Sequence, residues 1–337
     1  MTVPDSTPLS PALAAARDAA VVCDLSPLAV LAVTGVDAAT FLHGQLSSDV
    51  TGLAENAATR TSFNSPKGRM LANFVLWRDG PTAFRALLPG DLAEPVRKRL
   101  SMYVLRSKVV LEDVSAASTR LGIGGPQATD ALRETFGDAP RDRAVVRSGD
   151  ATLVGLPGTR YVVLVPPDRA QAVRDRMSAR AMPAPFAVWE WLTIRAGVPV
   201  VTVPVQDQIV AQAANWDILG GLDFRKGCYT GQEIIARMQY LGRLKERLFA
   251  FHADRPPPGA GTRIYGSGFG DQACGLVVNA APAPGGGSDV LAVVQLAAVD
   301  AGGLRLDAPG GTPLSPLPLP YDVPPPSPPR GRIGAPA

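Results

Sequence analysis

Lys226-Gly227-Cys228-Tyr229-Thr230-Gly231-Gln232-Glu233 is the most informative stretch of the chain. We call it the signature segment. It combines one thiol, two glycines, two hydroxyl groups and a carboxylate within eight residues. A segment that only packs rarely needs this mixture, whereas a functional site often does. Thr230 and Glu233 stand three apart just before the apolar run Ile234-Ile235-Ala236, which is the pattern of a helix capping box.

The thiol of the signature segment is the candidate reactive group. Cys228 stands just ahead of the predicted helix and close to Arg225 and Lys226. The positive end of a helix dipole and neighbouring cations both favour a thiolate over a thiol. We therefore take Cys228 as a candidate redox-active thiolate or transient metal ligand, supported by Lys226 and Arg225. The alternative is a capped helix behind a glycine turn, in which the cysteine is inert.

Aromatic and amide side chains near the signature segment are candidates for binding a flat ligand. Tyr229 and Trp216 carry rings that can stack on a heterocycle, and Gln232 is a third candidate contact. The alternative for both rings is a place in the core, which is the more common position for an aromatic residue near a turn.

The composition argues against several classes of protein. The chain has 337 residues, a formal net charge of +3 and 19% charged residues, as expected for a globular protein of two or three domains. So small an excess of positive charge makes direct binding of nucleic acid or of a membrane surface unexpected. With only two histidines and no CxxC pair, a stable metal site built by the protein alone is also unexpected.

The cysteines and the N-terminus indicate the compartment. Cys23, Cys228 and Cys274 lie far apart, and an odd number without regular spacing argues for a reducing environment. The N-terminus has no positive charge before Arg17 and resembles neither a secretory signal nor a transit peptide. No apolar run reaches the roughly 20 residues that a membrane-spanning helix needs. We expect a cytoplasmic protein without a membrane partner.

The alternation of apolar runs and turn residues predicts an α+β fold. The predicted strands are 28–33, 70–77, 84–88, 109–114, 121–124, 161–165, 248–251, 274–278 and 290–299, and the predicted helices are 91–105, 129–136, 168–179 and 189–196, with a short helix capped by Asp37. These elements divide the chain into a loose arm at 1–16, a first α+β module at 17–108, a second at 109–243, a small antiparallel β-barrel at 244–308 and a proline-rich tail at 309–337.

The signature segment resembles that of the YgfZ-type folate-binding proteins, and other blocks agree in order. These blocks are Phe41–Val50, Ser65–Met70, Gln208–Asp217, Gly220–Phe224, Ala236-Arg237 and Gly242-Arg243. The resemblance extends from about residue 25 to 320. It implies the fold of the glycine-cleavage aminomethyltransferases, which is also found in a tRNA-modifying GTPase: two α+β modules that bind a folate, followed by a β-barrel.

The resemblance also implies a function. Proteins of this family support the assembly or repair of iron–sulfur clusters, notably [4Fe-4S] clusters, in client enzymes, and bacterial members are linked to tRNA modification. Tetrahydrofolate is then the expected ligand, and client enzymes and assembly proteins are the expected partners. In this hypothesis the glutamate carboxylates of the folate meet Arg60, Lys67 or Arg69 through charge-assisted hydrogen bonds.

Two departures from the aminomethyltransferases separate this hypothesis from its main alternative, a folate-dependent aminomethyl or one-carbon transferase. Where those enzymes carry two adjacent aspartates, this chain aligns Leu71 and Ala72. Where they carry a glutamate before Ala-Gly, this chain has Arg195. The loss of acidic groups where an amine and a pterin bind weakens the case for a classical enzyme. A third possibility, an RNA-binding accessory protein, is disfavoured by the weak net charge.

Overall fold

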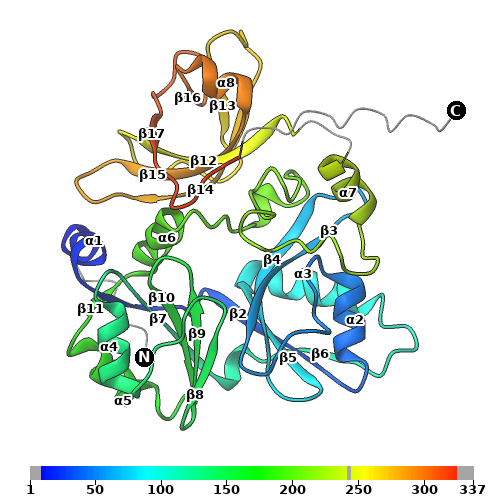
Figure 1. The fold of residues 1–337 in the computed structure, drawn as a ribbon. Coiled ribbons are helices and arrows are strands. Elements are labelled where there is room, and N and C mark those ends of the chain that lie inside the picture. Colours follow the sequence, from blue (N-terminus) through cyan, green and yellow to red (C-terminus); the bar gives the residue numbers. More distant parts are fainter. Residues whose placement is uncertain (1–8, 241–243, 325–337) are drawn as a thin grey trace, which may run out of the picture.

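The computed structural model describes residues 9–240 and 244–324, which form three β-sheets arranged around a shared centre (Figure 1). The first sheet has the order β3-β4-β5-β2-β6 and is antiparallel throughout. Its strands are β2 (Leu28–Thr34), β3 (Ala58–Asn64), β4 (Met70–Arg78), β5 (Ala83–Pro89) and β6 (Val110–Asp113), and its helices are α2 (Ala38–Gln45) and α3 (Gly90–Ser101).

The second sheet has the order β11-β1-β7-β10-β9-β8. Its strands are β1 (Val21–Asp24), β7 (Thr119–Gly124), β8 (Val145–Ser148), β9 (Ala151–Leu156), β10 (Arg160–Val165) and β11 (Met182–Ala184). The helices that accompany it are α1 (Leu9–Asp18), α4 (Ala128–Phe136), α5 (Ala170–Ser178) and α6 (Phe186–Arg195), with the 3-10 turns η1 (Ser115–Ala117) and η2 (Val203–Val205). One core cluster lies between this sheet and helices α4 and α5.

The C-terminal part is an antiparallel sheet of order β16-β13-β14-β15-β12-β17, curled into a half-barrel. It contains β12 (Glu246–Ala253), β13 (Arg263–Tyr265), β14 (Gly275–Pro282), β15 (Ser288–Gln295), α8 (Leu296–Ala301), β16 (Arg305–Leu306) and β17 (Ser315–Leu317). Alternate side chains of β15 enter two different cores: Leu291 and Val293 join the central cluster, and Val290, Ala292 and Val294 fill the half-barrel. Because both faces are buried, the strand is apolar almost throughout.

Helix α6 connects the half-barrel to the second sheet, since it packs on β14 and β15 of the half-barrel and on β1 and β7 of the second sheet (Figure 1). Its sequence is apolar on nearly all sides, as expected for a helix surrounded by protein. The remaining helix, α7 (Gln232–Tyr240), follows the signature segment and lies beside the first sheet.

The predicted α+β class is confirmed, and the C-terminal part predicted as a small antiparallel β-barrel is an antiparallel sheet curled into a half-barrel, but parts of the predicted division of the chain differ from the structure. The arm at 1–16 contains the start of α1, whose Ala12, Leu13 and Ala16 are buried against α6 and β11; residues 1–8 lie outside the described part. The modules also exchange strands, because β1 joins the second sheet and β6 joins the first. Such pairing between distant strands leaves no local signal in the sequence.

The predicted tail at 309–337 is also wrong in its first half. Strand β17 pairs with β12, Leu314 is 7% exposed, and the Tyr321 hydroxyl donates to the carbonyl oxygen of Gly197 at 2.7 Å. Its prolines are compatible with this arrangement because β17 is an edge strand, which tolerates residues without an N–H donor. Residues 325–337 lie outside the described part.

The predicted cap of α2 is replaced by a different contact. The Asp37 carboxylate accepts a hydrogen bond from the backbone N–H of Lys108 at 2.7 Å and makes no capping bond to the helix. Asp37 therefore ties α2 to the segment before β6, the strand that pairs with β2 at the edge of the first sheet.

Candidate functional site: a central cavity and the signature segment

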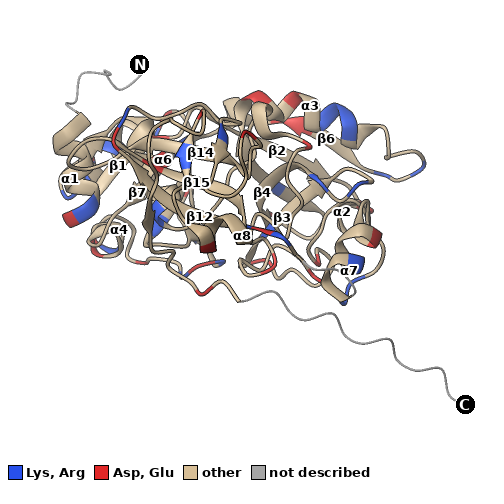
Figure 2. Cartoon of the chain, turned by 90° about the horizontal axis from the view of Figure 1, so that it is seen from above, with Lys and Arg blue, Asp and Glu red and all other residues tan. Residues whose placement is uncertain are grey.

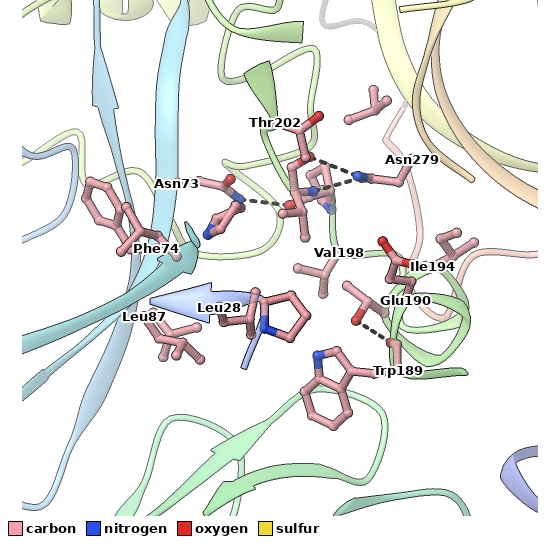
Figure 3. A pocket seen from close by; sticks show the side chains of 18 of the residues that line it. Leu28, Asn73, Phe74, Leu87, Trp189, Glu190, Ile194, Val198, Thr202 and Asn279 are labelled. Carbon is pink, nitrogen blue, oxygen red and sulfur yellow. Dashed lines mark hydrogen bonds between the residues drawn. The ribbon is translucent and has the colours of Figure 1, made fainter. Parts of the chain in front are cut away.

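A cavity of ≈ 540 Å³ lies where the first sheet, α6 and the half-barrel meet (Figure 3). Phe74 and Leu87 line it from the first sheet, and Trp189 and Glu190 line it from α6 on the opposite side. Pockets of about 300–1,000 Å³ with mainly apolar walls and a few polar groups are typical of small-molecule sites. The cavity therefore has the size and wall chemistry to hold a ligand with a flat apolar part.

One face of α6 forms a wall of the cavity. The residues on this face follow helical spacing: Phe186, Trp189, Glu190, Thr193 and Ile194. An aromatic ring, a carboxyl group and a hydroxyl group are thus placed by a single rigid element. Glu190 interrupts an otherwise apolar helix sequence, a signal that sequence reasoning did not use.

Two asparagine side chains hold the opposite edge of the cavity in place. The Asn73 amide donates to the carbonyl oxygen of Pro199 and accepts from the N–H of Val201, both at 2.8 Å. Asn279 pairs in the same way with the N–H and carbonyl oxygen of Val200, at 2.8 and 2.9 Å (Figure 3). Both amide groups are occupied by hydrogen bonds to backbone atoms. They therefore hold the wall in place and are not free to bind a ligand.

Two arginines from different sheets line the cavity. Arg60, 5% exposed, makes a bidentate ion pair with Asp142 at 2.8 and 3.1 Å and donates from Nε to the carbonyl oxygen of Leu219. Arg160, 2% exposed, donates to Pro157 and Thr193 and stacks over the ring of Trp189 at 5.2 Å. Arg160 begins β10, whose other residues are all apolar, so a charge at the edge of an apolar run was the signal that sequence reasoning missed.

Glu190 has an unusual protonation equilibrium. The residue as a whole is exposed, but the protein around its carboxyl group removes part of the solvent, and this desolvation raises the pKa of Glu190. Among the described residues no ion pair joins Glu190 to an arginine, so its carboxyl group remains available to a ligand. An N–H donor from a ligand would stabilise the ionised form of this carboxyl group.

We expect Glu190→Gln to stabilise the protein at high pH. The native state favours the neutral carboxyl, so wild-type stability falls as pH rises from the unfolded pKa of about 4.3 through the higher native pKa. Thermal unfolding should show a higher midpoint for the variant at about pH 8 and no difference near pH 4. Glu94→Gln is the control of opposite sign, because Arg97 lowers the pKa of Glu94 to about 2. A variant less stable than wild type at about pH 8 would contradict the assignment.

The signature segment lies on the C-terminal end of α2 and does not line the cavity. The Lys226 ammonium donates to the carbonyl oxygens of His43 and Leu46, the latter at 2.5 Å, and lies over the Tyr229 ring at 4.7 Å. Burial lowers the pKa of Lys226 to about 8, against the opposing effect of Asp49. Lys226 therefore satisfies orphan carbonyls at a helix end and anchors the segment.

Two of the sequence blocks that resemble the family meet the signature region. The Ser47 hydroxyl donates to the carbonyl oxygen of Gly221 at 2.6 Å, and the N–H of Asp223 donates to the Ser47 carbonyl oxygen at 2.9 Å. A Cβ atom added to Gly231, which has φ +83°, would lie 2.5 Å from the carbonyl oxygen of Ser65 and 3.0 Å from Cα of Gly68. The blocks around Ser47 and Ser65 thus converge on this region.

The predicted capping box does not form. Helix α7 begins at Gln232, so Gly231 occupies the boundary position and Thr230 lies one residue too early to cap. Within the described residues no hydrogen bond joins Thr230 and Glu233. The left-handed conformation of Gly231 sets this register, because it turns the chain directly into the helix.

The predicted site residues therefore fall into two groups. Arg60 and the fully buried Trp216 line the cavity. The other predicted residues are not among those lining it: Cys228, Lys226, Arg225, Lys67, Arg69, Tyr229 and Gln232.

The members of the second group differ in how accessible they are. Cys228 is exposed and free, whereas Cys23 and Cys274 are buried. Lys67 and Arg69 are exposed, and Arg69 donates to the carbonyl oxygen of Asp207 at 3.3 Å. Tyr229 is 7% exposed, which places its ring in the core.

The described residues contain neither a membrane-spanning helix nor a cluster of metal-ligating side chains. Between 9 and 240 and between 244 and 324, no helix is long and apolar enough to cross a bilayer. In the same residues, no three His, Cys, Asp or Glu side chains gather in a group that could hold a metal ion. Lys, Arg, Asp and Glu are interspersed in Figure 2, where α3 carries both signs of charge.

Comparison with known proteins places the fold in the aminomethyltransferase class. The structure is similar to the glycine cleavage system aminomethyltransferase T from Bartonella henselae, with a TM-score of 0.75 and 16% identity over 93% of this chain and 88% of that one. The family model described as the GCVT N-terminal domain matches residues 9–164.

The chain belongs to the YgfZ family. It is 34% identical over 258 residues to the tRNA-modifying protein YgfZ of Cronobacter sakazakii, a match that covers 75% of this chain and 78% of the relative. It is 33% identical over 305 residues to the protein of the same name from Yersinia pestis, covering 87% and 91%. The resemblance inferred from the signature segment is confirmed.

Proposed function

We propose that this protein binds a reduced folate in its central cavity and supports the assembly or repair of [4Fe-4S] clusters in client enzymes, including enzymes that modify tRNA. The observation that carries the folate proposal is the cavity of ≈ 540 Å³ with Trp189, Glu190 and two arginines in its wall. The fold class and the name of the YgfZ relatives, tRNA-modifying protein, support the wider role.

The cavity wall fits the chemistry of a folate. Trp189 and Phe74 provide aromatic surface for a pterin ring, and the partly desolvated Glu190 carboxylate is an acceptor for ring N–H groups. When bound, tetrahydrofolate would supply nitrogen atoms that accept a one-carbon unit. The protein's part is to hold the ring against α6 and to exclude water from it.

Tryptophan fluorescence tests the folate proposal. Trp189 and Trp216 line the cavity, whereas Trp77 and Trp191 do not. Titration with 5-formyltetrahydrofolate should quench wild-type emission in a saturable way, and Trp189→Phe should reduce the quenching more than Trp191→Phe does. A wild-type signal that shows no saturation, together with no heat of binding in calorimetry, would refute a folate site.

The exposed Cys228 supports the proposal for iron–sulfur clusters. A single thiolate cannot hold a cluster that ordinarily takes four cysteine ligands, so any cluster would share ligands with a partner protein. Cys228→Ala should fail to restore [4Fe-4S] enzyme activity in a strain lacking the protein, while its thermal midpoint stays at the wild-type value. Full restoration by a stably folded variant would remove Cys228 from the function.

The fold supports one alternative, a folate-dependent aminomethyl or one-carbon transferase. Leu71 and Ala72, which stand where the aminomethyltransferases carry aspartates, are 4% and 0% exposed and supply no acidic group. Formation of methylenetetrahydrofolate from tetrahydrofolate and an amine donor would favour the transferase. Folate binding without turnover would favour the assembly role.

A further inference from the structure

Arg160 is a buried cation with part of its hydrogen-bonding capacity open toward the cavity. Nε donates to the carbonyl oxygen of Pro157 at 3.0 Å, and Nη1 donates to the Thr193 hydroxyl at 2.6 Å. Nη2 has no hydrogen-bond acceptor among the described residues. It is not fully buried, because it is absent from the unpartnered polar atoms that have almost no accessible surface. Because Arg160 lines the cavity, Nη2 is the atom that reaches its open space.

Two of the other buried arginines, Arg60 and Arg247, have a carboxylate partner that Arg160 lacks, whereas Arg120 bonds only to backbone carbonyl oxygens. Arg60 meets Asp142, and Arg247 meets Asp217, each through a bidentate ion pair. No carboxylate lies within 4.0 Å of the Arg160 guanidinium among residues 9–240 and 244–324. A buried charge without a counter-ion is costly and is normally paired.

The electrostatic surroundings of Arg160 favour an anion. Burial, together with the smaller effect of the neighbouring Arg60 cation, lowers the pKa of Arg160 to about 9. Asp142 has the opposite effect, but its two oxygens are bound by Arg60. The cavity wall thus contains two guanidiniums, of which only that of Arg60 is paired with a carboxylate among the described residues.

We propose that Arg160 receives a carboxylate of the ligand bound in the cavity, through Nη2. The inference rests on the proposed folate function and assigns the ligand's acidic end to one residue. Arg60 is excluded from this role because its guanidinium is already occupied, and Lys67 and Arg69 are excluded because they do not line the cavity. Glu190, which makes no ion pair with Arg160 among the described residues, is left to accept hydrogen bonds from the heterocycle.

Calorimetric titration of the full-length protein with two probes tests this assignment. 5-Formyltetrahydrofolate carries glutamate carboxylates, whereas 6-methyltetrahydropterin has the reduced ring and no carboxylate. Arg160→Gln should lower the affinity for the first probe by at least about tenfold, the effect of losing a charged hydrogen bond, and change that for the second less than about twofold. Arg160→Lys, which keeps the charge without the planar fork, should give an intermediate loss for the first probe alone.

Arg120→Gln is the matched control. Arg120 is also buried, at 8% exposure, on β7 beside β10, but it donates to the carbonyl oxygens of Ser115 and Ser118 and does not line the cavity. This variant should bind both probes as the wild type does. Thermal midpoints of all variants separate loss of binding from loss of folding, and if Arg160→Gln does not fold, Arg160→Lys carries the comparison.

The outcomes distinguish the inference from the function on which it rests. Equal losses for both probes would mean that Arg160 only supports the cavity wall, and wild-type affinity in Arg160→Gln would mean that it touches no part of the ligand. Either result overturns the assignment while leaving folate binding intact. No binding of either probe by the wild type would overturn the proposed function and this inference together.

Discussion

Replacing Arg247 by methionine is expected to lower the free energy of unfolding by about 4 kcal/mol, because it leaves the largely buried carboxylate of Asp217 without a partner. Arg247 on β12 makes hydrogen bonds of 2.7 and 3.0 Å to the two oxygens of Asp217 and one of 2.8 Å to the Gln212 carbonyl oxygen. The side chains of this ion pair are 9% and 14% exposed. Urea unfolding followed by circular dichroism measures the loss.

The double variant Arg247→Met with Asp217→Leu is the control for this expectation. Removing both charges also removes the uncompensated one, so the double variant should recover most of the stability lost in Arg247→Met. A loss below about 1 kcal/mol in the single variant would show that the pair behaves as an exposed one. The pair joins the half-barrel to the segment that carries Trp216, so the single variant should also bind a cavity ligand more weakly.

Replacing Gly231 by alanine is expected to cost about 3 kcal/mol, the second largest effect. Its φ of +83° adds about 1 kcal/mol of backbone strain, and a Cβ atom would lie 2.5 Å from the Ser65 carbonyl oxygen, an overpacking contact worth about 1–3 kcal/mol. Backbone atoms cannot move aside as a flexible side chain can. The variant should therefore separate the signature segment from the turn that precedes β4.

Gly137→Ala measures the cost of backbone strain without the cost of a close Cβ contact. Gly137 has φ +81°, nearly the same as Gly231, and an added Cβ would meet no atom within 4 Å. Its alanine variant should lose only about 1 kcal/mol. Equal losses in the two variants would show that the close packing of Gly231 on Ser65 is not important. Alkylation of Cys228 should also become faster in Gly231→Ala and stay unchanged in Gly137→Ala.

The sequence allowed the long, strongly apolar strands to be predicted well. The run predicted at 70–77 is β4, Met70–Arg78, and the run at 161–165 is the apolar part of β10. Strands β8 and β9 were not predicted, because Arg147, Ser148 and the turn that follows break their pattern into short pieces. Neither strand contains more than two consecutive apolar residues, whereas β10 contains five.

The candidate site shows a different limit of sequence reasoning. The chemical peculiarity of the signature segment correctly indicated the family, but the cavity lies elsewhere and is built by single residues from α6, β10 and the first sheet. Arg160 and Glu190 are separated by 29 positions in the chain, and each looks like an isolated charge in an apolar run. The packing of α6 on β1 and β7 of the second sheet, which also contains β10, brings them into one cavity.

The two proposed functional features, the central cavity and the exposed Cys228, lie in different parts of the fold. The cavity offers an enclosed site for a small ligand, and the signature segment presents an exposed thiol on an anchored loop. Lys226 and Gly231 fix this loop to α2 and to the turn before β4, so ligand binding and the thiol share the first sheet as a common support.

The crystal structure of the protein grown with saturating 5-formyltetrahydrofolate would test the central claim most directly. We expect electron density for one ligand inside the central cavity, with the ring against Trp189 and a carboxylate at Nη2 of Arg160. A cavity that contains only solvent under these conditions, or a ligand bound instead on the outer surface beside Cys228, would contradict the claim that this cavity is the folate site.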